Sequence, residues 1–430
     1  MAGAFGGVES NASTGRSRRF VTREFNAASL RRSAKASVRR VANVSTVKRS
    51  PADGIRAIVC AFALFCCAFA LYRSAPAANA QPAPPASSAA SLPGVRAAPL
   101  PIRVVVVTTF EPGADTGDVP GEFQFWVERL PLPSVVAFPQ GYRSLRYDPA
   151  RGILGIVTGE GAERGAASVM ALGLDERFDL SHAYWVIAGI AGVDPKAASV
   201  GSAAWANWVV NADLGFEVDA RDIPRTWPTG IVPFNRATPF APPAPDADSI
   251  HGVNAYALNA GLASWAYALT ASVPLADTAN LRHIRARYAR FPNARRPPYV
   301  LRGDSLCGDR YWVGPSMNAW AERWVPYWTG GNGTFVMTAE EDAGIMQALT
   351  FLAHAARVDV RRVMVLRTAS DYTQPGDGGD AAGLLAGDAS KNGESAYLEA
   401  LEAAYRVGST AVNELTAHWE RYADHPPATP

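Results

Sequence analysis

The stretch Val104-Val105-Val106-Val107-Thr108-Thr109 decides the fold. Six consecutive β-branched residues favour a strand. Because this strand is apolar along most of its length, we expect it to be buried on both faces, as in the central sheet of an α/β protein. The residues that follow, 111–121, are rich in Gly, Pro and Asp and predict a loop. The folded domain is therefore expected to begin at about Ile102.

Working outward, apolar runs alternate with helical patterns along the rest of the chain. Further strands are expected at 153–157, 183–188, 205–211, 299–301, 335–338 and 363–366. Helices are expected at 163–174, 253–273, 316–325, 340–356 and 394–421, and long loops at 224–248 and 373–390. This alternation indicates an α/β fold, with one three-layer domain over residues 102–425 whose central mixed sheet is flanked by helices.

The N-terminal segment differs from the rest of the chain in charge. The first 80 residues hold 13 Lys and Arg but three acids, so a leader of net +10 precedes a body of net −8. Its apolar run, 57–71, is followed by the small-x-small cleavage pattern Ala78-Asn79-Ala80. A spanning helix needs about 20 residues, so the run favours a signal peptide, with an uncleaved anchor as the alternative. We therefore expect an exported protein, periplasmic or secreted, or one anchored by this segment.

The remaining bulk properties exclude several classes of partner. Residues 81–101 form a Pro/Ala/Ser linker. The acidic body argues against nucleic acid as a partner. After residue 80 no charge-free apolar run reaches about 18 residues, which excludes a membrane-spanning transporter body, so membrane contact is expected only through an uncleaved N-terminal segment. Cys307 is the single cysteine beyond the leader, so an internal disulfide of the body is excluded.

Motifs for metal or phosphate-loop chemistry are absent. The sequence has no His-Glu-x-x-His, Cys-x-x-Cys, Gly-x-Ser-x-Gly or phosphate-loop lysine, and its six histidines show no metal spacing. No metal or organic cofactor is therefore expected. Four other clusters follow predicted strands, where α/β sheets place their ligands: Glu111, 159–161, 189–192 and 367–371.

Five ordered segments carry a resemblance to a known family: FEPGADTG (110–117), GEGAERGAAS (159–168), WVIAGIAGVDP (185–195), MTAEEDAGIM (337–346) and VLRTASDYTQPG (365–376). Over nearly all of 102–420 the chain resembles the purine nucleoside permease family and, more distantly, type I nucleoside phosphorylases and nucleosidases. The resemblance implies a nucleoside-phosphorylase-like domain and purine nucleosides as partners, and a homo-oligomer is left open as an expectation. It implies cleavage of the N-glycosidic bond or, alternatively, a non-catalytic component that supports nucleoside transport.

By the same resemblance, Asp371 protonates or hydrogen-bonds N7 of the leaving base, with Ser370 and Thr368 beside it at the substrate. A carboxylic acid can do this where burial raises its pKa. The alternative interpretation is an aspartate that caps a turn before Gly376.

The resemblance assigns ribose and base contacts as well. Glu341 matches the acid that accepts hydrogen bonds from the ribose hydroxyls, although acids in a first helical turn also complement the helix dipole. Tyr311, with Trp312 as second choice, matches the aromatic residue that stacks on the base, although either ring could equally be part of the core.

The 189–192 segment bears on the nucleophile. Its small residues, which include Ala191 and Gly192, let backbone approach a ligand or simply form a tight turn. Phosphorylases usually carry an Arg and a Ser at this strand end, where this chain has Ile187 and Ile190, which cannot hold an anion. The departure favours hydrolysis over phosphorolysis. Water would then be oriented by a carboxylate acting as general base, for which the candidates are Glu111 or Glu122, with Glu160 and Glu163 as further candidates.

Overall fold

The computed structural model describes residues 98–242, 254–388 and 395–427. Contacts divide the chain into two units, 1–93 and 94–430, and the account below concerns the second unit. The predicted leader, 1–80, and most of the predicted linker, 81–101, lie outside the described residues.

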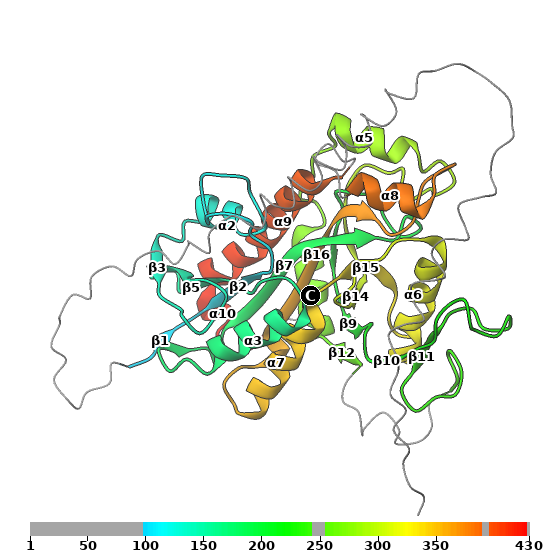
Figure 1. Ribbon diagram of the computed structural model, residues 1–430. Helices are drawn as coiled ribbons and strands as arrows, with labels where there is room; N and C mark the ends of the chain where they lie inside the picture. Colours follow the sequence, from blue (N-terminus) through cyan, green and yellow to red (C-terminus); the bar gives the residue numbers. More distant parts are fainter. Residues whose placement is uncertain (1–97, 243–253, 389–394, 428–430) are drawn as a thin grey trace, which may run out of the picture. The chain divides into compact units, whose positions relative to one another are not determined.

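Within the described residues, twelve strands form one mixed sheet (Figure 1). The strand β2 (Val104–Thr108) lies in its interior and pairs in parallel with β5 (Ile153–Val157) on one side and with β7 (Tyr184–Val193) on the other. Beyond β5 lie β4 (Leu145–Asp148) and β3 (Ser134–Val136). Beyond β7 follow β15 (Phe335–Ala339), β14 (Asp304–Cys307), β9 (Trp208–Asn211) and β12 (Ala255–Ala257).

A second set of strands branches from β7. The long strand β16 (Val363–Tyr372) runs parallel to β7 along its whole length and also pairs antiparallel with β8 (Ala203–Trp205). β8 in turn pairs with β13 (Val300–Arg302). Two small sheets stand apart, β1 (Leu100–Pro101) with β6 (Phe178–Asp179) and β10 (Gly215–Glu217) with β11 (Ile231–Pro233). β7 is thus the strand on which the sheet divides.

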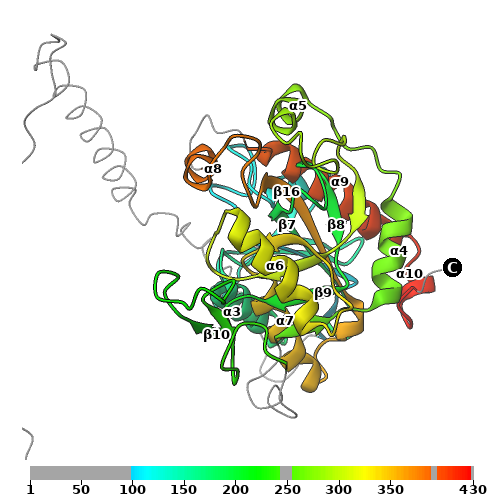
Figure 2. The ribbon, with the colours of Figure 1, turned by 90° about the vertical axis from the view of Figure 1, so that its right-hand side faces the viewer.

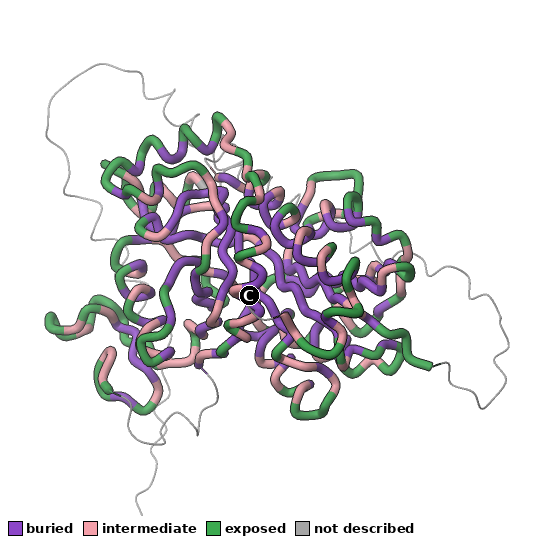
Figure 3. Tube along the Cα trace, turned by 180° about the vertical axis from the view of Figure 1, so that it is seen from behind, coloured by how far each residue is buried: buried purple, intermediate pink, exposed green. Residues whose placement is uncertain are grey.

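Helices cover both faces of the sheet, as the run of valines requires. Val105 and Val107 pack in one core with α3 (Ala162–Gly173) and α7 (Asp342–His354). Val104 and Val106 point the other way, into a core with α2 (Gln124–Arg129), α4 (Ala260–Thr270) and α9 (Tyr397–Ala417). All four valines are fully buried, and each such burial contributes about 1.5–3 kcal/mol. Figure 3 shows the buried strands enclosed by chain that is exposed on its outer side.

Three of the remaining helices, α5 (Ala279–Ala286), α6 (Pro315–Trp328) and α8 (Ala381–Asp388), lie around the β16 and β14 side of the sheet (Figure 2). The short α10 (Trp419–Tyr422) lies beside α4, and a 3₁₀ turn at Val360–Arg362 precedes β16. α6 packs Trp320 and Trp324 against Leu306 of β14 and Phe335 of β15. None of the helices within residues 98–242, 254–388 and 395–427 combines the length and apolar character that a bilayer-spanning helix needs.

The predicted α/β class, with helices on both faces of a central mixed sheet, is confirmed. Two strand ends were predicted wrongly, and both matter for function. β7 was expected to stop at Ala188 and continues to Val193, and β16 was expected to stop at Leu366 and continues to Tyr372. Each strand finds backbone partners on the other along this extension, so the turn expected at 189–192 is strand instead.

Other boundaries were corrected by local hydrogen bonds. The strand expected at 205–211 is two strands, because Asp304 Oδ1 accepts the N–H groups of Asn207 and Trp208 at the break. The helix expected from 253 begins at Ala260, where the Asn259 side chain caps it, and residues 255–257 form β12. The loop expected at 373–390 contains α8, and the one expected at 224–248 contains β11.

Candidate functional site

A cavity of about 220 Å³ lies against the extended halves of β7 and β16. Its wall also includes residues that follow β2 (Thr109, Phe110), the segment after β14 (Arg310 to Trp312), the junction of β15 and α7, and Tyr397 at the start of α9. Because these segments are far apart in sequence, the cavity is a product of the sheet topology. Tyr311 is 45% exposed, so the cavity reaches the surface on its side.

Nine of the twelve predicted site residues line this cavity. They are Glu122, Glu160, Ala191, Gly192, Tyr311, Trp312, Glu341, Ser370 and Asp371. The two acids expected to bind base and ribose, Asp371 and Glu341, therefore lie on the same side of the sheet and face one cavity.

Three predicted residues, Glu111, Glu163 and Thr368, do not line the cavity. The Glu111 carboxylate is buried and accepts the backbone N–H groups of Gly121, Phe123 and Gln124 at 2.8–2.9 Å. It holds the start of α2 in place, so the expectation that it orients water is corrected. Thr368 is fully buried, and its hydroxyl donates to the Ala400 carbonyl at 2.8 Å, which ties β16 to α9.

Asp371 owes its position to an irregularity in β16. The pairing of β16 with β7 shifts register between Ala369 and Asp371, so that Asp371 lies opposite Gly192. Such bulges redirect side chains. The Ser370 hydroxyl donates to Asp371 Oδ2 at 2.7 Å and the Tyr311 hydroxyl to Oδ1 at 3.2 Å. Burial raises the pKa of Asp371 above its usual value, while these two hydrogen bonds lower it.

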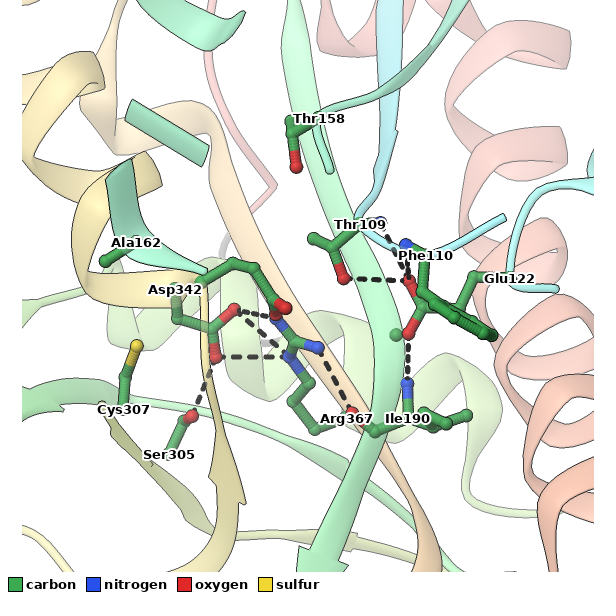
Figure 4. A network of polar contacts seen from close by, with 12 residues as sticks. Thr109, Phe110, Glu122, Thr158, Ala162, Ile190, Ser305, Cys307, Asp342 and Arg367 are labelled. Atoms are coloured by element: carbon green, nitrogen blue, oxygen red, sulfur yellow. Dashed lines mark hydrogen bonds and ion pairs between the residues drawn. The ribbon is translucent and has the colours of Figure 1, made fainter. Parts of the chain in front are cut away.

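Glu341 is fixed by a buried arginine. Arg367 Nη2 donates to Glu341 Oε2 at 2.9 Å and to Asp342 Oδ1 at 2.6 Å, and Arg367 Nη1 donates to the Ile190 carbonyl at 3.1 Å. The Ser305 hydroxyl donates to the other oxygen of Asp342 at 2.7 Å. Figure 4 shows Arg367 reaching across the strands toward Asp342, with Ser305 below. Since the guanidinium is held from several directions, the carboxylate of Glu341 has a defined orientation.

Glu122 is held equally firmly on the other side of Ile190. Its Oε2 accepts the Thr109 N–H at 2.7 Å, the Thr109 hydroxyl at 3.0 Å and the Phe110 N–H at 3.1 Å, and its Oε1 accepts the Ile190 N–H at 2.7 Å (Figure 4). Burial is the largest cause that raises the pKa of Glu122 to about 7, against the lowering effect of Arg367. A carboxylate with a pKa near neutrality is suited to proton transfer.

Glycine at 189 allows this arrangement. A Cβ at Gly189 would lie 2.5 Å from both Arg367 Nη1 and Glu122 Oε1. A side chain at position 189 would clash with both groups. Arg367 and Glu122 can therefore approach β7 this closely only because residue 189 is glycine.

The cavity carries a negative balance of charge. Five of its described lining residues are acids, namely Glu122, Glu160, Glu340, Glu341 and Asp371, and two are arginines. Both arginines are already paired, Arg367 as above and Arg310 with Glu217 of β10 at 2.9 Å. Burial and the neighbouring Glu341 raise the pKa of Glu340 to about 7, as expected where carboxylates crowd together.

Comparison with known proteins shows the family of this chain. The model of the family described as purine nucleoside permease matches residues 101–427. The chain belongs to the purine nucleoside permease family. It is 30% identical over 291 residues to a probable purine nucleoside permease of Schizosaccharomyces pombe, an alignment that covers 66% of this chain and 82% of the relative. It is 29% identical over 272 residues to a purine nucleoside permease of Candida albicans, which covers 62% of this chain and 64% of that relative, slightly less than two thirds of its length.

Solved structures of nucleosidases are also similar to this member of the permease family. The 5′-methylthioadenosine/S-adenosylhomocysteine nucleosidase of Neisseria meningitidis is 16% identical, with a TM-score of 0.42 over 73% of this chain and 99% of that one. Futalosine hydrolase of Helicobacter pylori is 14% identical, with a TM-score of 0.44 over 73% and 98% of the two chains.

In this permease-family chain, sequence reasoning placed Arg367 in the 367–371 cluster without giving it a role, and it missed Glu340 and Tyr397 as cavity residues. A signal existed for Arg367, because an arginine directly after the buried run Val363–Leu366 must find a charged partner inside the protein. None existed for Tyr397, which the path of α9 brings to the cavity, where its ring packs edge-on to Phe110. Among the described residues, no group of three or more His, Cys, Asp or Glu is arranged to hold a metal ion.

Proposed function

We propose that the protein binds purine nucleosides in this cavity and cleaves their N-glycosidic bond by hydrolysis. The observation that carries the proposal is that Asp371, Glu341 and Glu122 line one cavity, each held by hydrogen bonds. The three carboxyl groups correspond to three needs of the reaction: a proton for the base, support for the sugar and a base for water.

Asp371 serves the leaving base. As the bond between C1′ and N9 breaks, its electron pair passes to the purine ring, and a proton from Asp371 to N7 neutralises the charge. The raised pKa of Asp371 supports this role, because a carboxyl group must hold its proton to donate it. Tyr311 and Trp312 line the same cavity and offer ring faces for stacking on the base.

Glu341 serves the ribose. A carboxylate can accept hydrogen bonds from both vicinal hydroxyl groups, and its negative charge stabilises the sugar as it becomes oxocarbenium-like. The Arg367 contact at 2.9 Å supports the role, since it orients Glu341, whose second oxygen has only a long contact of 3.5 Å with the Gly161 N–H.

Glu122 serves the nucleophile. Water attacks C1′, the new C1′–O bond replaces the bond to the base, and Glu122 takes the proton that water loses. A pKa of about 7 allows Glu122 to be ionised before the reaction and protonated after it at neutral pH.

The charge balance supports water over phosphate as the nucleophile. Phosphate would enter a cavity with five acids, whose two arginines are already paired with Glu217, Glu341 and Asp342. An anion needs unpaired donors to offset the loss of its hydration. The cavity therefore favours a neutral nucleoside and disfavours phosphorolysis.

A second candidate is a binding component without catalysis that supports nucleoside transport. It is favoured by the names of the relatives, two of which are described as purine nucleoside permeases. Both candidates use the same cavity, and both accord with export directed by the N-terminal leader, which we propose from its charge and apolar run.

One assay separates the candidates. The purified protein is incubated with adenosine, inosine and guanosine, with and without inorganic phosphate, and free base is measured by chromatography. We expect free base at the same rate in both conditions. Release that requires phosphate would contradict hydrolysis, and tight binding without release would establish the binding component.

A further inference from the structure

Both oxygens of Asp371 accept hydrogen bonds from neighbouring hydroxyl groups. Ser370 donates to Oδ2 at 2.7 Å and Tyr311 donates to Oδ1 at 3.2 Å. A hydrogen bond that a carboxylate accepts favours its ionised form, which has no proton to give. The acid role proposed for Asp371 is therefore favoured when one of these two contacts is lost as a base arrives.

The contact with Ser370 is the more rigid of the two. Ser370 is 4% exposed, lies next to Asp371 in β16, and its hydroxyl is also 3.1 Å from the Ala191 carbonyl of β7. Its backbone carbonyl accepts the Ala396 N–H at 2.7 Å and the Ser395 hydroxyl at 3.2 Å, so this buried side chain has little freedom.

The contact with Tyr311 is the more replaceable. Tyr311 is 45% exposed and lies in the segment between β14 and α6, which is bounded by Gly308 and Gly314. Gly314 has a φ of +135°, a backbone conformation that residues other than glycine rarely adopt. Because almost half of its surface is exposed, the Tyr311 side chain is less confined than that of Ser370.

Asp371 Oδ1 also lies beside Gly192, which lines the cavity, since a Cβ at Gly192 would lie 3.0 Å from this oxygen. A base that bonds to Oδ1 competes for the place of the Tyr311 hydroxyl. Building on the proposed function, we propose that Tyr311 is a positioning residue whose hydroxyl keeps Asp371 an acceptor until the purine base displaces it. The displacement frees Asp371 to donate and brings the tyrosine ring to the face of the base.

Electrostatics agree with this exchange. The Tyr311 hydrogen bond lowers the pKa of Asp371, so its loss raises the pKa and favours the protonated acid. Six other charged groups line the cavity around Asp371. They are Arg310 beside Tyr311, Arg367 on β16, Glu340 and Glu341 before α7, Glu160 before α3 and Glu122 before α2.

The test follows the ionisation of Asp371 directly. The ¹³C resonance of its carboxyl carbon, assigned by its absence in Asp371→Asn, is titrated by NMR in the full-length protein and in Tyr311→Phe. Without ligand, we expect the pKa of Asp371 to be higher in Tyr311→Phe than in the unchanged protein. The proton affinity of Asp371 should rise by about threefold to tenfold. With saturating adenine, hypoxanthine or guanine, we expect the two proteins to titrate alike. Above the pKa of Asp371, the variant should bind the base more tightly by the same factor.

A matched control is Tyr397→Phe, which removes a hydroxyl from the same cavity wall. That hydroxyl donates to the Pro120 carbonyl at 2.7 Å, so Asp371 should titrate as in the unchanged protein. Equal titration of Tyr311→Phe and the unchanged protein without ligand would overturn the proposal. A difference that persists with the base bound would overturn the displacement alone, whereas failure of every purine to bind would overturn the proposed function as well.

Discussion

Among single residues, Asp371 has the most specific proposed task. Asp371→Asn retains the shape of the side chain and still allows hydrogen bonds with Ser370 and Tyr311, but it removes the carboxyl proton that the reaction needs. We expect turnover of a purine nucleoside to fall by roughly 10²–10⁴-fold, and affinity to change by only a few fold. Turnover and dissociation constant, measured separately, check this. Unchanged turnover would remove Asp371 from the leaving-group role.

Glu122 provides a prediction about stability and pH. Its pKa is raised from 4.5 to about 7 in the folded protein, so the folded state binds a proton that the unfolded chain releases over that range. Its contribution is fully present below about pH 4.5 and is lost as pH rises through about 7, a change of about 3 kcal/mol.

The measurement compares Glu122→Gln with the unchanged protein by urea denaturation at pH 5 and pH 8. The variant cannot titrate at position 122. As pH rises from 5 to 8, the unchanged protein should therefore lose more unfolding free energy than the variant does. Glu340→Gln is the matched control for the second cavity carboxyl with a pKa near 7. Parallel pH curves for Glu122→Gln and the unchanged protein would contradict the raised pKa of the buried Glu122.

At the scale of the element, β7 matters because it has no side chain at Gly189. In Gly189→Ala the new methyl group would lie 2.5 Å from Arg367 Nη1 and Glu122 Oε1, so both must move. We expect a loss of about 1–3 kcal/mol in unfolding free energy together with loss of nucleoside binding. Calorimetry and a binding titration check this against Gly387→Ala in α8, where a Cβ meets no atom within 4 Å. Equal effects of the two substitutions would contradict the role of Gly189.

The elements also show what the sequence could and could not predict. The valine run of β2 and the motif residues Asp371 and Glu341 were found because their signals are local: β-branching, and short ordered motifs. The extensions of β7 and β16 were missed, because they depend on each strand pairing with the other. The register shift that aims Asp371, and the arrival of Tyr397 from α9, are likewise products of packing between distant segments.

For the whole molecule, the cavity joins β7, β15, β16 and α9, so a ligand in it should stabilise the entire fold. A purine nucleoside at 100 times its dissociation constant should add about 2.7 kcal/mol to the free energy of unfolding. Inorganic phosphate should add nothing, because both cavity arginines are paired. Thermal unfolding with each ligand checks this, with Glu341→Gln as the variant that should lose the nucleoside effect. Stabilisation by phosphate alone would contradict the charge argument.

The central claim is that one purine nucleoside lies between Asp371 and Glu341, and a crystal structure of the protein with a bound nucleoside tests it most directly. The account predicts N7 of the base within about 3 Å of the Asp371 carboxyl group and the ribose hydroxyls at a similar distance from Glu341. It also predicts the Tyr311 ring against the base, with its hydroxyl away from Asp371. A nucleoside bound outside this cavity, or bound with its ribose at Asp371, would contradict the account.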